Sequence, residues 1–107
     1  MAREEFASDV TRERFDAVRD MLEGARRKTR PRKHDLYEVF CAVLYLLENR
    51  IAWRSMPRDF PPWRTVHEYF SQWIVARPGE CSLLERALAG VGKEALAARV
   101  HALSVDR

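Results

Sequence analysis

The side chains in this sequence that are best placed for chemistry are arginines and short polar groups at helical spacing. In residues 63–75, Val66, Phe70 and Trp73 recur as one apolar stripe and leave the polar residues on the other side. Arginine, histidine and hydroxyl side chains form hydrogen bonds with base edges and phosphate oxygens. We therefore expect this segment to contact double-stranded DNA through Arg64, Thr65, His67 and Ser71. The alternative for His67 is an ordinary surface histidine.

Positive charge is concentrated in residues 24–34. The whole chain has a net charge of +3, but residues 1–23 sum to −3, residues 35–107 sum to zero, and residues 24–34 carry six basic residues and no acid. Such a block repels itself, extends, and favours polyanions, although a solvated linker is the alternative. The residues expected to bind the DNA backbone are Arg26, Arg27, Lys28, Arg30, Arg32 and Lys33, with Arg50, Arg54 and Arg58 on flanking phosphates.

Patterns for other kinds of chemistry are weak. The two cysteines and three histidines fit no zinc-ligand spacing, and no metal or cofactor is expected. Asp35 and Ser82 precede helical runs, each with a glutamate three residues later, so these residues are read as helix caps rather than catalytic groups. The three tryptophans could stack on unpaired bases. Their positions beside prolines and on the apolar stripe favour roles as core and loop anchors.

Helical signals recur along the chain and predict an all-α fold. Thr11 is a candidate cap for a first helix whose face is Phe15, Val18 and Leu22, ending at Gly24. Residues 36–47 are apolar nearly all round and follow Asp35, which predicts a buried central helix; a buried strand is the competing assignment. A turn, one helical turn within residues 52–56 and a proline loop lead to a third helix from 62 or 63 to about 75.

Two further helices are expected near the C-terminus. One follows Ser82, and the other runs from Lys93 to about Leu103 with a narrow apolar stripe that either packs on the domain or forms a dimer seam. The whole is a small helical bundle of about five helices containing a helix-turn-helix. We divide it into a DNA-binding domain at 1–89, with the basic linker at 24–34, and a C-terminal helix at 90–107.

Composition limits the cellular context. Hydrophobic residues make up 47% and charged residues 33% of the 107 residues, which is typical of a globular domain. No apolar run approaches the ~18 residues of a membrane span, and the N-terminus does not look like a signal peptide. We expect a cytoplasmic protein that makes no contact with membranes.

An ordered series of motifs resembles the N-terminal domain of insertion-sequence transposases of the IS-five type. The matching motifs are Arg30-Pro31-Arg32, Tyr45-Leu46-Leu47, Trp53-Arg54, Met56-Pro57, Phe60-Pro61-Pro62-Trp63, Thr65-Val66, Tyr69-Phe70 and Trp73. The chain departs from the family where Arg50 replaces a turn glycine and Ile51 a frequent cysteine. Glycine suits a left-handed backbone, which a side chain such as that of Arg50 disfavours. Asn49 is therefore expected to adopt the left-handed conformation instead.

The resemblance implies a function in transposition and DNA recombination. It implies a helix-turn-helix that recognises terminal inverted repeats, while a separate DDE nuclease domain cuts and joins the DNA. This chain is then expected to be a non-catalytic first-reading-frame product, or a decayed or repurposed fragment, and not an enzyme. The alternative is a protein-interaction module that forms a homodimer or pairs with a transposase to regulate it.

Overall fold

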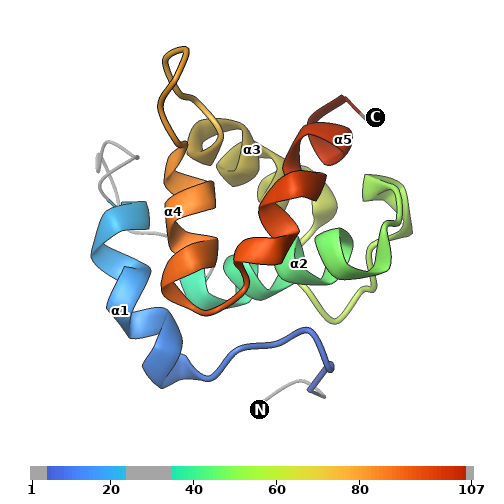
Figure 1. The fold of residues 1–107 in the computed structure, drawn as a ribbon. Helices are drawn as coiled ribbons and strands as arrows, with labels where there is room; N and C mark the ends of the chain where they lie inside the picture. The colour runs from blue at the N-terminus through green and yellow to red at the C-terminus, as the bar shows by residue number, and fades with distance from the viewer. Residues whose placement is uncertain (1–4, 24–34, 106–107) are drawn as a thin grey trace.

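The computed structural model describes residues 5–23 and 35–105, and within these ranges the chain is helical without strands. Five α-helices and two 3₁₀-helices follow one another, which confirms the all-α fold class (Figure 1). In chain order they are α1 (Arg12–Glu23), α2 (Leu36–Asn49), η1 (Trp53–Ser55), α3 (Trp63–Trp73), α4 (Leu83–Gly90), η2 (Glu94–Arg99) and α5 (Val100–Val105).

Helix α2 is the centre of the fold, as its nearly unbroken apolar sequence predicts. It packs against α1, α3, η2 and α5 (Figure 1). The Asp35 side chain accepts a hydrogen bond of 3.0 Å from the Tyr37 amide and so caps the helix. Its buried residues are Leu36, Val39, Phe40, Cys41, Ala42, Val43, Leu44, Leu46 and Leu47. A helix buried on almost every side fixes the positions of the elements around it.

Helix α1 begins where its cap was predicted. The Thr11 hydroxyl accepts a hydrogen bond of 3.1 Å from the Arg14 amide. Phe15, Val18 and Leu22 are all buried, which confirms the predicted apolar face. Helix α1 packs against α4, while Gly24, its expected end, lies outside the described residues.

The turn after α2 differs from the prediction. Arg50, rather than Asn49, takes the left-handed conformation, with φ at 52° and ψ at 45°. Asn49 stays in the helix, and its side-chain amide donates a hydrogen bond of 2.9 Å to the Tyr45 carbonyl. The prediction was wrong because it chose Asn49, since asparagine adopts the left-handed conformation more readily than arginine. The helix instead continues through Asn49, which leaves the left-handed position to Arg50.

Residues 50–62 contain the predicted single helical turn, η1, and a proline loop closed by a hydrogen bond from the Phe60 amide to the Pro57 carbonyl. Helix α3 then starts directly after Pro62, whose carbonyl accepts from two amides of the first turn. It ends at Trp73, two residues before the expected end. Its buried residues are Val66, Tyr69, Phe70 and Trp73.

The C-terminal region packs into the same core. The predicted capping box at Ser82 and Glu85 is present in both directions. The expected single last helix is instead a 3₁₀ segment, η2, that continues into the short helix α5; 3₁₀ turns are frequent at helix N-termini. Leu96, Val100 and Leu103 are at most 8% exposed. None of the helices in the described ranges is long and apolar enough to cross a membrane.

Candidate nucleic-acid interface

Helix α3 presents a polar face to solvent opposite its buried stripe. Arg64, Glu68, Ser71 and Gln72 are exposed and follow one another at intervals of four, three and one residues, so they lie on one side of the helix. All four side chains can donate or accept hydrogen bonds. This outward face is the largest array of hydrogen-bonding groups that α3 offers.

Two of the residues predicted on this face lie at its edges. Thr65 is half-buried on one flank. His67 is half-buried on the opposite flank, where its ring lies edge-on to Trp53 at 4.9 Å and to Trp63 at 6.4 Å between centroids. The Ser71 hydroxyl lies 3.5 Å from His67 Nδ1. Packing between two aromatic rings therefore accounts for part of the role of His67.

The outward face also carries an acid that was not among the residues predicted to contact DNA. Glu68 is exposed between Arg64 and Ser71 on the outward face. A carboxylate repels phosphates but accepts a hydrogen bond from the amino group of cytosine. The signal that could have found it is its spacing, since Glu68 lies four residues after Arg64 and three before Ser71.

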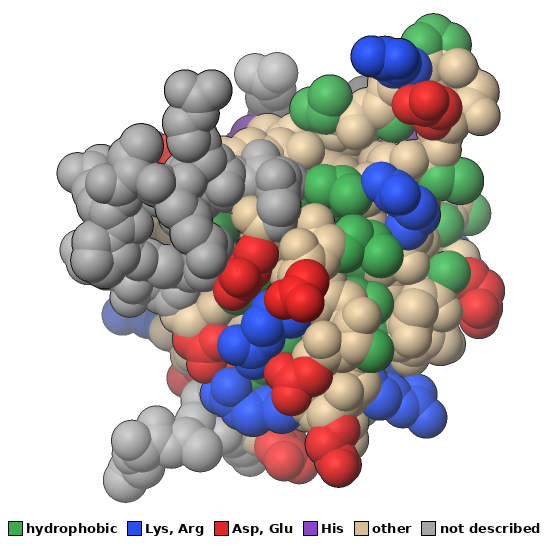
Figure 2. All heavy atoms as spheres, turned by 90° about the vertical axis from the view of Figure 1, so that its left-hand side faces the viewer, with side chains coloured by type: hydrophobic (Ala, Val, Ile, Leu, Met, Phe, Trp, Pro, Cys, Tyr) green, Lys and Arg blue, Asp and Glu red, His purple; other side chains and the backbone are tan. Residues whose placement is uncertain are grey.

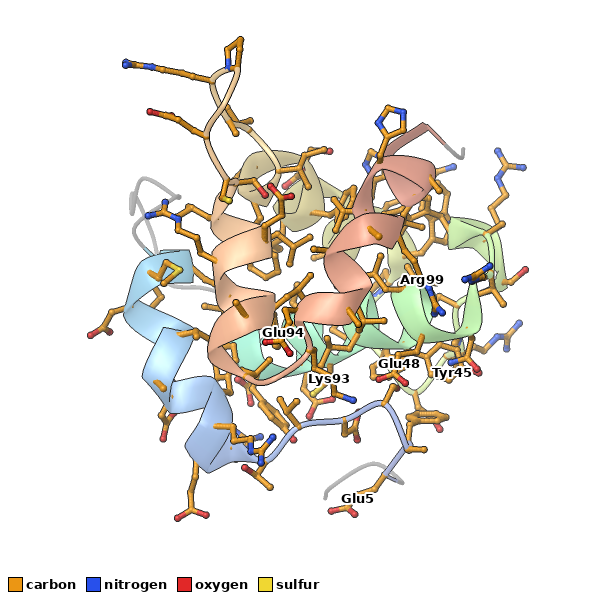
Figure 3. All side chains as sticks on the ribbon, in the orientation of Figure 1. Glu5, Tyr45, Glu48, Lys93, Glu94 and Arg99 are labelled. Atoms are coloured by element: carbon orange, nitrogen blue, oxygen red, sulfur yellow. The ribbon has the colours of Figure 1, made fainter. Side chains whose placement is uncertain are left out.

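The arginines of the described residues divide into two groups. Members of the first have partners within the fold: Arg12 with Asp35 at 2.9 Å, Arg19 with Asp16 at 2.9 Å, Arg14 with the Val91 carbonyl, and Arg99 with the Leu47 and Glu48 carbonyls. The hydrogen bond to Asp35 raises the pKa of the Arg12 guanidinium. Figure 3 shows Arg99 beside the C-terminal end of α2, where Lys93 also pairs with Glu48 at 2.7 Å.

Members of the second group are exposed and form no ion pair within the described ranges. They are Arg50, Arg54, Arg58, Arg64, Arg77 and Arg86. Every described arginine that the sequence predicted to contact DNA belongs to this group. A guanidinium that forms no ion pair in the described ranges is available to bind phosphate or a base edge without breaking a salt bridge.

Arg64 is held against an aromatic surface. Its guanidinium carbon lies 5.3 Å from the centroid of the Trp63 ring, a distance at which a cation and an aromatic ring attract. Trp63 is half-buried, whereas Trp53 and Trp73 are fully buried, so two of the three tryptophans are core anchors as predicted. The stacking restricts the side chain of Arg64 at the start of the outward face.

The predicted basic contacts at Arg26, Arg27, Lys28, Arg30, Arg32 and Lys33 lie outside the described residues. The face formed by α1 carries acidic and basic side chains side by side (Figure 2). Exposed residues of that helix include Glu13, Asp16 and Asp20. This mixed surface is a poor site for a polyanion, which leaves α3 and the 50–62 segment as the candidate interface.

Metal-binding and redox features are sparse in the parts of the chain that the structure describes. There, no three His, Cys, Asp or Glu residues are grouped so that they could hold a metal ion. Cys41 is buried and Cys81 is exposed, and both are free thiols.

Comparison with known proteins gives one match. Residues 10–77 match the model of a family described as "Putative transposase of IS4/5 family". The match includes α1, α2, η1 and α3, and so the whole candidate interface from Arg50 to Ser71. No curated protein and no solved structure matches the chain significantly.

Proposed function

Because this chain belongs to the IS4/5 transposase family, we propose that it binds double-stranded DNA sequence-specifically, at the terminal inverted repeats of an insertion sequence. The observation that carries the proposal is the outward face of α3. Hydrogen-bonding side chains lie there opposite a buried aromatic stripe, and the segment that leads into α3 carries exposed arginines that form no ion pair within the described ranges. A helix and its side chains fit the major groove, which is about 12 Å wide.

In the proposed complex α3 lies in the major groove. Arg64, stacked on Trp63, is suited to a bidentate hydrogen bond with guanine, and Ser71 and Gln72 are suited to further base edges. Glu68 suits a cytosine amino group and excludes bases that offer only acceptors. Thr65 and His67 at the flanks are close enough to the outward face to contact the groove walls.

Phosphate contacts hold the helix in register. Arg50, Arg54 and Arg58 come from the segment that leads into α3 and are exposed. We assign them to phosphates beside the groove, and the basic residues between 26 and 33 to the backbone further along the duplex. This division predicts that these residues raise affinity for all sequences equally, while those on α3 discriminate between sequences.

Cutting and joining DNA with metal ions needs carboxylates that converge from separate elements. Of the described acids, Asp35 and Glu85 cap helices and Glu48 forms an ion pair, and no three His, Cys, Asp or Glu residues in the described ranges are grouped to hold a metal ion. We propose that this chain is the non-catalytic part or a regulator of a transposase, that the chemistry belongs to a separate domain, and that the chain acts in the cytoplasm, where insertion-sequence DNA lies.

Pairing with itself or with a transposase is the second candidate function. The stripe first considered for a dimer seam, Leu96, Val100 and Leu103, is buried within this chain and is not available to a partner. An open cavity of about 540 Å³ between the end of α2 and the η2–α5 segment, lined by Leu46, Ile51 and Ala98 among others, offers an alternative contact for a partner. Light scattering at several protein concentrations separates a monomer from a dimer.

A salt titration tests the proposal of DNA binding. Fluorescence anisotropy of a labelled random-sequence duplex, measured at several salt concentrations, gives the number of phosphates neutralised. With about six contacts, the logarithm of affinity should fall against the logarithm of salt with a slope of about −5. Absence of binding at low salt, or binding that salt does not weaken, would contradict the proposal.

A further inference from the structure

The loop between α3 and α4 stands apart from the helical body. Residues 75–81 are all exposed, and the loop rises beyond the helices at the top of Figure 1. A Cβ atom built on Gly79 would meet no atom within 4 Å. Val75, at the base of the loop, is 73% exposed and is the exposed large hydrophobic residue of the described ranges. The loop therefore adds little to the core, so packing does not account for its residues.

The loop is nevertheless well defined. The Glu80 amide donates a hydrogen bond of 3.0 Å to the Arg77 carbonyl, and Pro78 is followed by Gly79 with φ at 84°. Proline followed by a residue of positive φ is the pattern of a type II turn. The α3 end and the capping box of α4 hold the two ends of the loop. A segment that is already ordered loses little conformational entropy when it binds a partner.

The base of the loop lies directly after the C-terminal end of α3. The helix ends at Trp73, Ile74 is its C-cap, and the exposed Val75 is the first residue beyond the cap. With α3 in the major groove, as proposed above, we expect the loop that follows the helix to pass the phosphate backbone and to reach the adjacent minor groove. Arg77 belongs to the group of exposed arginines without an ion pair in the described ranges. Arginine is the side chain that narrow, A·T-rich minor grooves attract.

Resting on the proposed DNA binding, we propose that the 75–81 loop is a second DNA-reading element, in which Arg77 enters the minor groove next to the site of α3. Val75 packs against the sugars at the rim of that groove. Glu80, the one acid of the loop, forms no ion pair with Arg77. Its charge opposes phosphate and limits affinity. The ligand class is thus a duplex whose minor groove is narrow and lacks the guanine amino group.

Three synthetic duplexes separate minor-groove reading from other contacts. They are alternating dA-dT, dG-dC and dI-dC polymers. The minor groove of an I·C pair resembles that of A·T because the guanine amino group is missing, while its major groove resembles that of G·C. Since dI-dC and dG-dC polymers share a major-groove pattern, we expect the wild-type chain to bind dG-dC polymer roughly fivefold more weakly than dI-dC polymer, while dA-dT polymer also differs at the groove read by α3.

The variants are Arg77→Ala and Arg86→Ala, which remove the same charge from two exposed arginines. Arg77→Ala should abolish the preference for dI-dC over dG-dC, while Arg86→Ala should keep it. Glu80→Gln should strengthen binding to all three polymers. Circular dichroism checks that each variant is folded.

Several results would overturn the inference. Equal weakening of all three complexes by Arg77→Ala would show a backbone contact only, and unchanged binding would show no contact. Altered sedimentation of Arg77→Ala in the absence of DNA, with unchanged DNA affinity, would mark the loop as a protein interface. In each of these cases DNA binding by α3 stands, whereas failure of the wild-type chain to bind any duplex removes both proposals.

Discussion

At the scale of single residues, Arg50 illustrates how a functional side chain and a strained backbone can coincide. Its φ of 52° lies in the left-handed region, which is unfavourable for residues with a Cβ atom. In the motif series that the chain resembles, glycine stands at this position. The exposed guanidinium, placed between α2 and η1, offers a phosphate contact that glycine cannot provide. Stability and DNA affinity are therefore expected to respond in opposite directions when this residue is changed.

Arg50→Gly should stabilise the fold and weaken DNA binding. Relief of the left-handed conformation outweighs the added freedom of the unfolded chain, so we expect about 0.5–1 kcal/mol of added stability. Thermal denaturation measures it as a rise in Tm. Arg50→Ala is the control, because it removes the same guanidinium and keeps the Cβ atom. Both variants should lose the same DNA affinity. A rise in Tm for Arg50→Ala as well would show that loss of the charge, rather than relief of backbone strain, causes the added stability.

At the scale of elements, the close approach of α1 and α4 holds the left-hand side of the molecule together (Figure 1). A Cβ atom at Gly90 would lie 2.6 Å from Val18 Cγ1, and Val18 is 2% exposed. Such a distance is shorter than van der Waals contact. Since the valine side chain is short and buried, the two helices would have to move apart to admit a methyl group.

Gly90→Ala should therefore destabilise the protein, although alanine favours a helix. Overpacking typically lowers the free energy of unfolding by roughly 1–3 kcal/mol, against a propensity gain of up to about 1 kcal/mol. Urea denaturation gives the difference. Adding Val18→Ala to Gly90→Ala should restore part of the lost stability, because Val18→Ala removes the Cγ1 atom that the new methyl group meets. If the stability losses of the two single variants simply add in the double variant, the contact between α1 and α4 is not the cause.

Elements also show where the sequence was sufficient and where it was not. The apolar stripe Phe15, Val18 and Leu22 and the caps at Asp35 and Ser82 could be predicted, because each depends on residues within one or two turns. The 3₁₀ conformation of η2 could not be predicted, since the spacing of Leu96, Val100 and Leu103 does not distinguish a 3₁₀-helix from an α-helix. The position of His67 also escaped prediction, because Trp53, which packs on it, comes from another element.

At the scale of the whole molecule, internal contacts decide which charges are available. The net charge of +3 arises from residues 24–34, because residues 1–23 sum to −3 and residues 35–107 sum to zero. Ion pairs and hydrogen bonds to carbonyls engage Arg12, Arg14, Arg19 and Arg99, and this sorting was invisible in the sequence. The sequence could indicate the side of α3 that faces outward. Only the structure could separate the arginines that stabilise the fold from those without an ion pair in the described ranges.

The C-terminal region is expected to be part of the folding unit. Arg99 donates to two carbonyls at the end of α2, and the Trp53 indole donates to the Leu103 carbonyl at 3.3 Å. Ending the chain at Ala89 would expose the apolar residues that η2 and α5 cover. Each Å² of apolar surface exposed lowers the free energy of unfolding by roughly 25 cal/mol. We therefore expect the Tm to fall by about ten degrees or more, or unfolding to lose its cooperativity. A shortened chain with the same Tm as the full chain would show that this region contributes little to the stability of the bundle.

The most direct test of the central claim, that the outward face of α3 reads DNA, is selection of binding sites from random duplexes by the full chain and by two single variants. The wild-type chain and Arg86→Ala should select the same sequence. Arg64→Ala should lose the preference at one base pair, with a discrimination loss of about 1–3 kcal/mol there, and keep the rest of the site. A wild-type chain that selects no sequence, or an Arg64→Ala profile identical to that of the wild type, would contradict the account.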